Sequence, residues 1–404
     1  MKLLVAAVLV VSTGIALAQP APPAADVTLD QALDLYRQHS ARLAAARSAV
    51  DVTAADLVEA RIYPNPEAGL TTARTAAGDT AGPTMQYQLD LSVPILIGHQ
   101  RGKRGDAARA HVEQTRSEVN ADQAEAELEI QGRFLTLLSA QEKTTLLTAA
   151  LADAKTLREI VAGRTSAGAG SSYAVERIDL AIAALGSRVD ESHADEQVAS
   201  SALAVAIGIP GWQPHAAGAL VAESAAPQAV VDAAHPLLAV DRAKHAAARA
   251  DEERAHADAV PTPSIGVQTF TTTGPQGLGV AGGFSIPLPL FDRNQGAVAR
   301  ARAAARQAEL ELAATSVELA GALEQATRDL AARRDALAKY QTSAMQRLVK
   351  VREMAEAAYR SGQGGIVELL DALDAITDAR LRELELRATV ADAELAVRRA
   401  SRGR

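Results

Sequence analysis

Apolar side chains recur at intervals of seven residues over most of the segment 298–358. A heptad pattern sustained over this length predicts a long helix that supercoils with neighbouring helices. A second apolar stripe follows over residues 366–395, and the glycine-rich stretch 361–365 between the two predicts a tight turn. The C-terminal part of the chain is therefore expected to form a long helical hairpin. The heptad positions are Val298, Ala305, Leu312, Leu319 and Ala326 in one series, and Leu323, Leu330, Leu337, Ala344, Val351 and Ala358 in the other.

The N-terminal half follows the same plan. One long helix is expected over about 98–163 and a matching one over about 294–360. At 1.5 Å per residue, about 65 residues make a rod of roughly 100 Å. The glycine-rich stretch 167–171 again predicts a tight turn before a closing helix. Near the start of the chain, Thr28 and Gln31 form a T-x-x-Q capping box, which predicts where the first helix begins.

Four short motifs occur twice, in the same order and 192–197 residues apart. We therefore interpret the chain as two structural repeats, 28–209 and 229–404, joined by an equatorial linker over 210–228 that is loop-like in composition. Each repeat is expected to hold a helix, two strands, a long helix, a hairpin turn and a closing helix. The paired motifs are His39-Ser40 with His235-Pro236, Pro64-Asn65-Pro66 with Pro261-Thr262-Pro263, Ser92-Val93-Pro94 with Ser285-Ile286-Pro287, and Val175-Glu176-Arg177-Ile178-Asp179 with Val367-Glu368-Leu369-Leu370-Asp371.

Alternating apolar and polar positions mark the segment before each long helix. Every second residue is apolar over 85–95, and a fainter alternation covers 278–288. A period of two predicts strands with one apolar face. The expected strands are about 66–75 and 84–95 in the first repeat, and about 263–273 and 278–289 in the second.

Two interpretations of these strands are open. A soluble antiparallel sheet buries its apolar face against a core, whereas a strand of a membrane barrel turns that face to lipid. Residues 261–290 hold no charged side chain in a chain that is 22% charged, which favours the membrane. Four strands leave open edges that lipid does not tolerate, so the chain must oligomerise. A dimer would supply eight strands and a trimer twelve, and only the larger number leaves a lumen for solutes.

Composition and charge narrow the function further. The chain is 48% apolar but only 3% aromatic and is rich in alanine, which suits long, thinly packed helices. Its net charge of −8 argues against nucleic acid as a partner. The absence of cysteine excludes disulfides, thiolate metal sites, cysteine nucleophiles and a lipid attached to an N-terminal cysteine.

The N-terminus has the pattern of a secretory signal. Lys2 precedes an apolar run over residues 3–17, and Ala16-Leu17-Ala18 matches an A-x-A cleavage site. We expect a cleaved signal peptide over 1–18 and a linker over 19–27. A membrane anchor is the alternative, but the run is short and the cleavage site comes at once. The protein is therefore expected to leave the cytoplasm.

A search for catalytic and cofactor-binding motifs gives no indication of an enzyme. The eight histidines are scattered without ligand spacing, so we expect no fixed metal site. Gly277, Gly279 and Gly282 satisfy G-x-G-x-x-G, but Pro287 stands where a dinucleotide site requires a helix. The sequence has neither a P-loop nor a G-x-S-x-G elbow. We expect no cofactor and no enzymatic activity.

The export signal, the duplicated plan and the four strands together resemble the TolC-type outer-membrane efflux factors over essentially the whole mature chain. Two segments are similar to the branch that serves cobalt–zinc–cadmium and related heavy-metal efflux. They are Tyr63-Pro64-Asn65-Pro66-Glu67 and Ser285-Ile286-Pro287-Leu288-Pro289-Leu290-Phe291-Asp292-Arg293-Asn294-Gln295-Gly296.

The resemblance implies a mainly α fold with transmembrane β. The long coiled-coil hairpins of an internally duplicated chain would form an α-barrel in the periplasm. The four strands would contribute to a trimeric 12-stranded β-barrel in the outer membrane. A homotrimer of this kind would be a passive conduit that carries out no chemistry of its own. It would work with a periplasmic adaptor (a membrane fusion protein) and an inner-membrane pump, and divalent heavy-metal cations are the expected substrate.

The resemblance also places a gate near the hairpin turns. It matches Tyr359 to the gate tyrosine, and Glu368 and Asp371 to an acidic ring at the constriction. Glu176 and Asp179 repeat that spacing in the first half. The alternative is that these acids have no role in a gate. Acidic residues are common in the first turns of a helix because its dipole favours negative charge there. Gly364 stands where a basic residue is expected, so a tyrosine–arginine lock is not predicted. The hairpin tips expected to meet the adaptor hold Gly168, Gly170, Ser171, Gly362, Gly364 and Gly365.

Three other functions stay open. A drug or solvent channel of the same family would share every feature above. A periplasmic coiled-coil adaptor or scaffold should carry a lipoyl-like β segment between its helices, whereas both hairpins here close through short glycine-rich turns. An exported enzyme lacks a catalytic constellation in this sequence.

Overall fold

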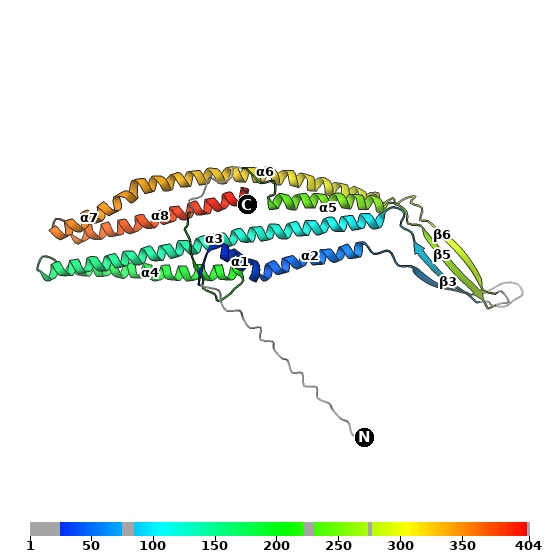
Figure 1. Cartoon of the computed structure of the whole chain (residues 1–404), viewed down its shortest axis with the longest axis horizontal. Coiled ribbons are helices and arrows are strands. Elements are labelled where there is room, and N and C mark those ends of the chain that lie inside the picture. Colours follow the sequence, from blue (N-terminus) through cyan, green and yellow to red (C-terminus); the bar gives the residue numbers. More distant parts are fainter. Residues whose placement is uncertain (1–24, 75–84, 222–229, 274–276, 402–404) are drawn as a thin grey trace, which may run out of the picture.

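The chain forms an elongated molecule with helical hairpin ends at one extreme and a β-sheet at the other (Figure 1). The computed structural model describes residues 25–74, 85–221, 230–273 and 277–401. The expected signal peptide over 1–18 lies outside the described residues, as do most of the linker over 19–27 and the end of the equatorial linker over 210–228.

The first half begins with two helices where the sequence predicted one. Helix α1 spans Leu29–His39 and α2 spans Ala41–Ala60. Ser40 separates them with an extended backbone, and its hydroxyl accepts a hydrogen bond from the Leu43 amide at 3.2 Å. Serine favours such a cap because its side chain satisfies an amide that the helix leaves unpaired. The prediction of a single helix at the start of this half was therefore wrong.

The rest of the first half comprises two strands and two helices. Strands β2 (Glu67–Arg74) and β3 (Met85–Pro94) are followed by α3 (Gln100–Ser166), which is 67 residues long. Helix α4 (Ser172–Ile207) returns beside α3. The two-residue strand β1 (Asp26–Val27) pairs in parallel with β4 (His215–Ala216), so the segment expected to be a linker contains a strand.

The second half repeats the order of elements with one interruption. It contains α5 (Pro236–Asp258), β5 (Ser264–Thr272), β6 (Gly279–Ser285), α6 (Gln295–Tyr340), a π-helical turn η1 (Gln341–Met345), α7 (Gln346–Ser361) and α8 (Ile366–Ser401). The single long helix expected over about 294–360 is thus divided. Strand β6 also ends at Ser285 rather than at about 289, because Pro287 and Pro289 have no amide to donate to a ladder.

The π-helical turn moves the coiled-coil seam by one residue. Leu330 and Leu337 are buried as the heptad predicts. Beyond the turn, Val351 is 40% exposed, whereas Tyr359 is buried at 4%. A π-bulge adds one residue to an α-helix and leaves the helix regular on either side of it. The seam therefore continues through Tyr359 instead of Ala358, and the heptad predicted across this turn was wrong beyond Leu337.

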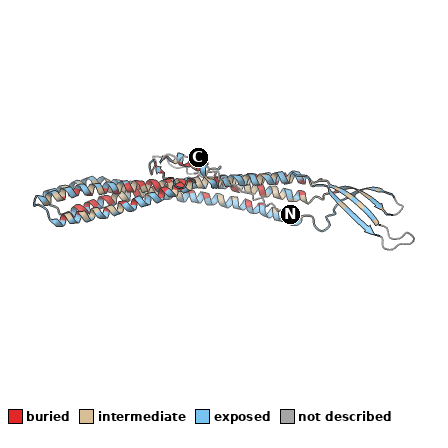
Figure 2. Cartoon of the chain, turned by 90° about the horizontal axis from the view of Figure 1, so that it is seen from below, coloured by how far each residue is buried: buried red, intermediate tan, exposed pale blue. Residues whose placement is uncertain are grey.

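The helices form successive layers around α3. Helix α3 packs against α2 and α4 on one side and against α5 and α8 on the other, and α6 covers α5 and α8 (Figure 1). Burial is concentrated in the middle and at the hairpin ends of the rod, whereas the strands are mostly exposed (Figure 2).

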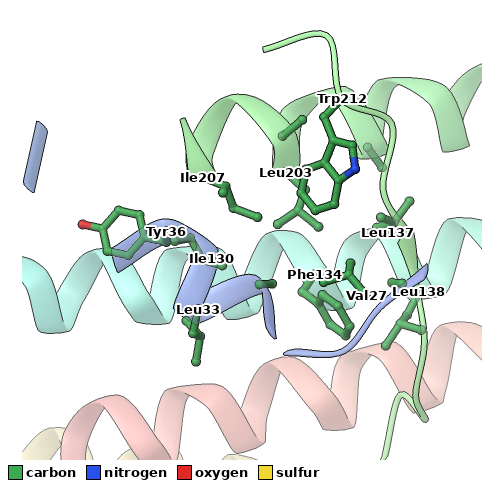
Figure 3. Close-up of a cluster of buried hydrophobic side chains, with 14 of the residues drawn as sticks. Val27, Leu33, Tyr36, Ile130, Phe134, Leu137, Leu138, Leu203, Ile207 and Trp212 are labelled. Atoms are coloured by element: carbon green, nitrogen blue, oxygen red, sulfur yellow. The ribbon is translucent and has the colours of Figure 1, made fainter. Parts of the chain in front are cut away.

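The largest buried cluster lies midway along the rod, where α1, β1 and the segment after α4 cover α3 and α4 (Figure 3). Trp212, which comes after α4, joins Phe134 and Leu137 of α3 and Leu203 of α4. Full burial of such a leucine or phenylalanine contributes roughly 1.5–3 kcal/mol. The cluster holds the helices together in the middle of the molecule. The hairpin ends lie away from it and depend on their own contacts.

Among the residues that the structure describes, no helix has an apolar stretch long enough to cross a membrane.

Candidate functional site at the hairpin ends

Two turns close the helical hairpins side by side at one end of the molecule (Figure 1). Gly168 has a φ of +74° in the first turn, and Gly362 has a φ of +78° where it caps α7. Glycine adopts this left-handed conformation without the steric cost that other residues incur. In the first turn, Ser171 caps α4 and accepts a hydrogen bond from the Ala174 amide at 3.3 Å. Of the expected adaptor-facing positions, Gly168, Gly170, Ser171, Gly362 and Gly365 are exposed, and Gly364 is half-buried.

Tyr359 lies between the two hairpins. It belongs to a buried cluster with residues of α3 and α4, among them Val161 and Ile178, and with Leu370 of α8. Its ring therefore packs against the first hairpin within the same chain. The last turn of α7 depends on that packing for its position.

Arg164 binds this tyrosine from the first hairpin. Its guanidinium carbon lies 4.6 Å from the centroid of the Tyr359 ring, a cation–π geometry. Its Nη1 donates to the Tyr359 carbonyl oxygen, and its Nη2 donates to the Ala169 carbonyl oxygen at 3.0 Å. The basic partner of the tyrosine thus comes from α3, and not from position 364, where the family resemblance had suggested one. Arg164 stands in the last turn of α3, where a cation is common for the helix dipole alone, so no local signal distinguished it.

A second arginine joins the hairpins about two turns away. Arg352 of α7 donates from Nη1 and Nη2 to the two carboxylate oxygens of Asp153 of α3, at 2.9 and 3.0 Å. Its Nε also donates to Glu356 at 2.9 Å. These hydrogen bonds raise the pKa of Arg352 above its ordinary value, with Glu356 contributing most. Because the π-helical turn moves the seam by one residue, Arg352 occupies the seam position that the heptad had predicted for Val351.

Glu368 and Asp371 play different parts at the start of α8. Oε2 of Glu368 accepts a hydrogen bond from the Gly365 amide at 3.0 Å, so this carboxylate caps its own helix. Asp371 is exposed one turn later and forms no ion pair within the described part of the chain. Burial raises the pKa of Asp374, and the carboxylates of Asp378 and Asp371 raise it further. Together these four acids make an acidic face on α8.

The corresponding acids of the first half are not equivalent. Both carboxylate oxygens of Asp179 accept hydrogen bonds from Arg158, one of them at 3.0 Å from Nη2. This contact lowers the pKa of Asp179 and compensates its charge. Glu176 is exposed and forms no capping bond of the Glu368 kind among the described residues. On α8, Asp378 pairs with Arg188 of α4 at 3.4 Å, whereas Asp371 has no ion-pair partner among the described residues. The two hairpins therefore differ in the compensation of their acids, although the sequence spacing is the same in both.

The described residues hold no group of three or more histidines, cysteines or acids arranged to bind a metal ion. The acidic face of α8 is thus an open surface and its carboxylates are not gathered around one point.

Comparisons with known proteins agree with this architecture. Residues 231–401 match the family described as outer membrane efflux protein. The chain is 27% identical over 379 residues to the cobalt-zinc-cadmium resistance protein CzcC of Cupriavidus metallidurans, covering 90% of this chain and 87% of the relative.

Solved outer-membrane channels have the same fold. The structure of CusC is 16% identical with a TM-score of 0.76, covering 93% of this chain and 92% of CusC. VceC of Vibrio cholerae is 16% identical with a TM-score of 0.71, covering 92% and 95%. The open state of MtrE of Neisseria gonorrhoeae is 15% identical with a TM-score of 0.72, covering 92% and 88%.

Proposed function

We propose, on the premise that this chain belongs to the outer membrane efflux protein family, that three copies assemble into one passive conduit of a tripartite heavy-metal efflux system. The chain is an outer-membrane efflux channel and not an enzyme. The trimer, the partners and the metal substrate are the parts that we propose. The exposed apolar face of the sheet is the observation that carries the proposal.

That face runs across all four strands. The sheet order is β2-β3-β5-β6, with every pair antiparallel. Leu70, Leu89, Thr269 and Val280 stand opposite one another in register, so they share one face. Leu70, Leu89 and Val280 are all exposed. No helix of the described chain covers this face, which supports lipid as its partner.

The opposite face is mostly polar, with Phe270 as its one large apolar side chain among the described strands. The side chains of Gln88 and Gln268 hydrogen-bond across β3 and β5 at 2.9 Å. Asp90 lies over Gly69 of β2, where a Cβ atom would come within 2.5 Å of the carboxylate. A polar face behind an apolar one suits a water-filled lumen. Because β2 and β6 are open edges, closure needs neighbouring chains, and three copies of four strands would make twelve.

The helical layers support the same assembly. Large apolar side chains are exposed on the two outer layers of the rod, which are formed by α2 with α4 and by α6. A contact between the α6 layer of one chain and the α2 and α4 layer of the next would cover both and close a ring. The exposed residues are Val52 and Val58 of α2, Leu180, Val198 and Val205 of α4, and Leu310 and Val317 of α6.

The hairpin ends would form the gate of this channel. Arg164 with Tyr359, and Arg352 with Asp153, hold the second hairpin against the first. Opening requires these contacts to change when the adaptor and the pump engage the tips at Gly168, Gly170, Ser171, Gly362, Gly364 and Gly365. The acidic face of α8, with Glu368 and Asp371, would line the constriction together with the lesser contribution of Glu176 and Asp179.

Divalent metal cations are the proposed substrate. The name of the 27% identical relative specifies cobalt, zinc and cadmium resistance, and uncompensated carboxylates such as Asp371 favour cations. Organic drugs or solvents are the alternative within the same class, and a coiled-coil adaptor or scaffold is the alternative outside it.

The test is to delete the gene in the cell that encodes it and to measure accumulated zinc, cobalt, cadmium and an organic dye. We expect the deletion strain to accumulate metal. Expression of the wild-type chain should reverse this accumulation, and expression of Asp371→Asn should reverse it less well. Glu318→Gln, an exposed acid on α6, is the matched control. Dye accumulation without metal accumulation would instead support the drug channel. A chain that fractionates away from the outer membrane would overturn the channel proposal.

A further inference from the structure

We infer that the loop over residues 286–293, between β6 and α6, is a membrane-interface loop that places its apolar side chains among lipid tails and Arg293 at phospholipid phosphates. The inference rests on the proposed function, since it requires the sheet to lie in a membrane. It assigns a partner to an exposed apolar surface that belongs neither to the α-barrel nor to the strands.

The apolar side chains of this loop are uncovered to an unusual degree. Phe291 is 91% exposed, Leu288 is 71% exposed and Leu290 is 67% exposed. Three large apolar residues within four positions, all open to solvent, form a patch that calls for a partner.

The loop is nevertheless held in one conformation. The Leu290 amide donates to the Leu288 carbonyl at 2.8 Å, and Nε2 of Gln295 donates to the Phe291 carbonyl at 3.1 Å. The Arg293 amide donates to Oε1 of Gln295 at 2.7 Å. Asn294 then ties the end of the loop to α5 through a hydrogen bond to the Ala255 carbonyl at 2.8 Å. The apolar side chains are therefore presented by an ordered backbone, which lowers the entropic cost of binding a partner.

The loop continues the apolar face of the sheet. Val93, Ile265 and Phe284 stand in register across β3, β5 and β6, one row before the ladder ends at Pro94, Ser264 and Ser285. Ile286 comes two residues after Phe284 and is also exposed. The surface proposed to face lipid thus extends without a break into the loop.

The first half has a smaller counterpart at the same junction. Tyr63 donates from its hydroxyl to the Pro94 carbonyl at 2.9 Å and accepts from the Leu96 amide at 3.3 Å. Its ring is partly exposed, and Ile97, the residue after Leu96, is exposed as well. Tyrosine in this arrangement, with an apolar ring and a bonded hydroxyl, is typical of the level where lipid tails meet headgroups.

Arg293 supplies the charge that an interfacial segment needs. Its Nε donates to the Pro289 carbonyl at 3.2 Å, and no carboxylate pairs with its guanidinium within the described residues. The neighbouring carboxylate of Asp292 accepts a hydrogen bond from the Asn294 amide at 2.8 Å. Both Nη groups of Arg293 are therefore available to a phosphate while the apolar side chains enter the hydrocarbon.

A second copy of the chain is the competing partner, because β6 is an edge strand and a neighbouring β2 would lie beside it. Lipid is favoured because the loop combines exposed apolar side chains with an unpaired arginine and extends the apolar sheet face.

The experiment uses the full chain in vesicles of phosphatidylcholine with phosphatidylglycerol, with bromine on the lipid tails near the headgroup. The only tryptophan, Trp212, lies in the helical core and gives the background. We expect brominated lipid to remove most of the emission that Phe291→Trp adds. Glu318→Trp, about 24 residues into α6 and so roughly 36 Å along the helix, should lose none. Arg293→Gln added to Phe291→Trp should reduce the quenching.

The oligomeric mass of the same sample separates this inference from the proposed function. A trimer that inserts into vesicles but leaves the Phe291→Trp emission unquenched overturns the loop inference alone and points to a neighbouring chain as the cover. Failure to form a trimer or to enter vesicles overturns the proposed function as well.

Discussion

The guanidinium of Arg164 is stacked 4.6 Å from the ring centroid of Tyr359 and also binds the carbonyl of that residue. The last turn of α3 thereby holds the last turn of α7, across 195 residues of sequence. A cation–π contact contributes about 0.5–1 kcal/mol at an exposed site and about 2 kcal/mol when desolvated. The two hairpins of one chain are thus joined without a basic residue at Gly364.

Removal of this contact should loosen the hairpin ends. In planar bilayers we expect Arg164→Gln to give a larger single-channel conductance than the wild type, because α7 loses its stacking partner and the hydrogen bond to its last turn. Arg360→Gln is the matched control, since Arg360 is exposed in the same turn and pairs with Glu356 of its own helix at 3.6 Å. Equal conductance of the two variants would contradict a role for Arg164 in closure.

The ring of Tyr359 should matter more than its hydroxyl. The ring is buried, whereas the hydroxyl makes no hydrogen bond within the described part of the chain. We expect Tyr359→Ala to cost about 3–5 kcal/mol, the range for truncating a buried aromatic ring. Tyr359→Phe should retain both the packing and the contact with Arg164. Thermal denaturation of the purified protein measures both, and a larger loss for the phenylalanine variant would show that the hydroxyl has an unseen partner.

The two possible roles of Glu368 are separable by mutation. Glu368→Gln removes the charge but keeps an oxygen that can accept from the Gly365 amide, whereas Glu368→Ala removes both. If the residue acts chiefly as a helix cap, only the alanine variant should lower stability, by about 0.5–2 kcal/mol. If its charge attracts cations, both variants should lower the cation-to-anion permeability ratio. Reversal potentials across a salt gradient and thermal denaturation give the two readouts.

Deletion of one residue from the π-helical turn should be tolerated. Leu337 and Tyr359 are 22 residues apart, one more than three heptads. Deletion of Ser343 would leave a continuous α-helix in which Leu337 and Tyr359 are three heptads apart, so both stay in the buried coiled-coil seam. Deletion of Glu353 instead would rotate Tyr359 by about 100° relative to Arg352. We expect a melting temperature near that of the wild type for the first deletion and a clear fall for the second. Similar falls for both would show that the turn itself is needed.

His111 should make the free energy of unfolding decrease as pH rises. Nε2 of His111 on α3 lies 2.9 Å from Oδ2 of Asp251 on α5, and this hydrogen bond raises the pKa of His111 above its ordinary 6.5, although burial and Arg254 oppose the rise. The folded state therefore binds the proton more tightly than the unfolded chain. The stabilisation is complete below about pH 6.5 and is lost as pH rises through the higher pKa of the folded state.

The melting temperature of wild type should accordingly exceed that of His111→Gln by more in mildly acidic than in alkaline buffer. His193→Gln, which removes a more exposed histidine of α4, is the control. A difference that is constant with pH would contradict the assignment.

Signals between close neighbours in sequence were sufficient for several features. The capping box of Thr28 and Gln31 is confirmed, with both of its hydrogen bonds present. Gly362 ends α7 in the glycine-rich turn that the sequence marked. Strand β3 forms where apolar and polar residues alternate. Each of these depends on residues within a few positions of one another.

The sequence by itself determined the long helices, the turns that close them and the apolar face of the strands, because capping, glycine conformation and periodicity act locally. Only the tertiary structure decided which side chains meet. One additional residue in the turn at Gln341–Met345 brings Tyr359 rather than Ala358 into the seam. The partner of that tyrosine is Arg164, from the other hairpin. Such contacts depend on rotation accumulated along tens of residues and on packing between distant segments, and no local pattern encodes either.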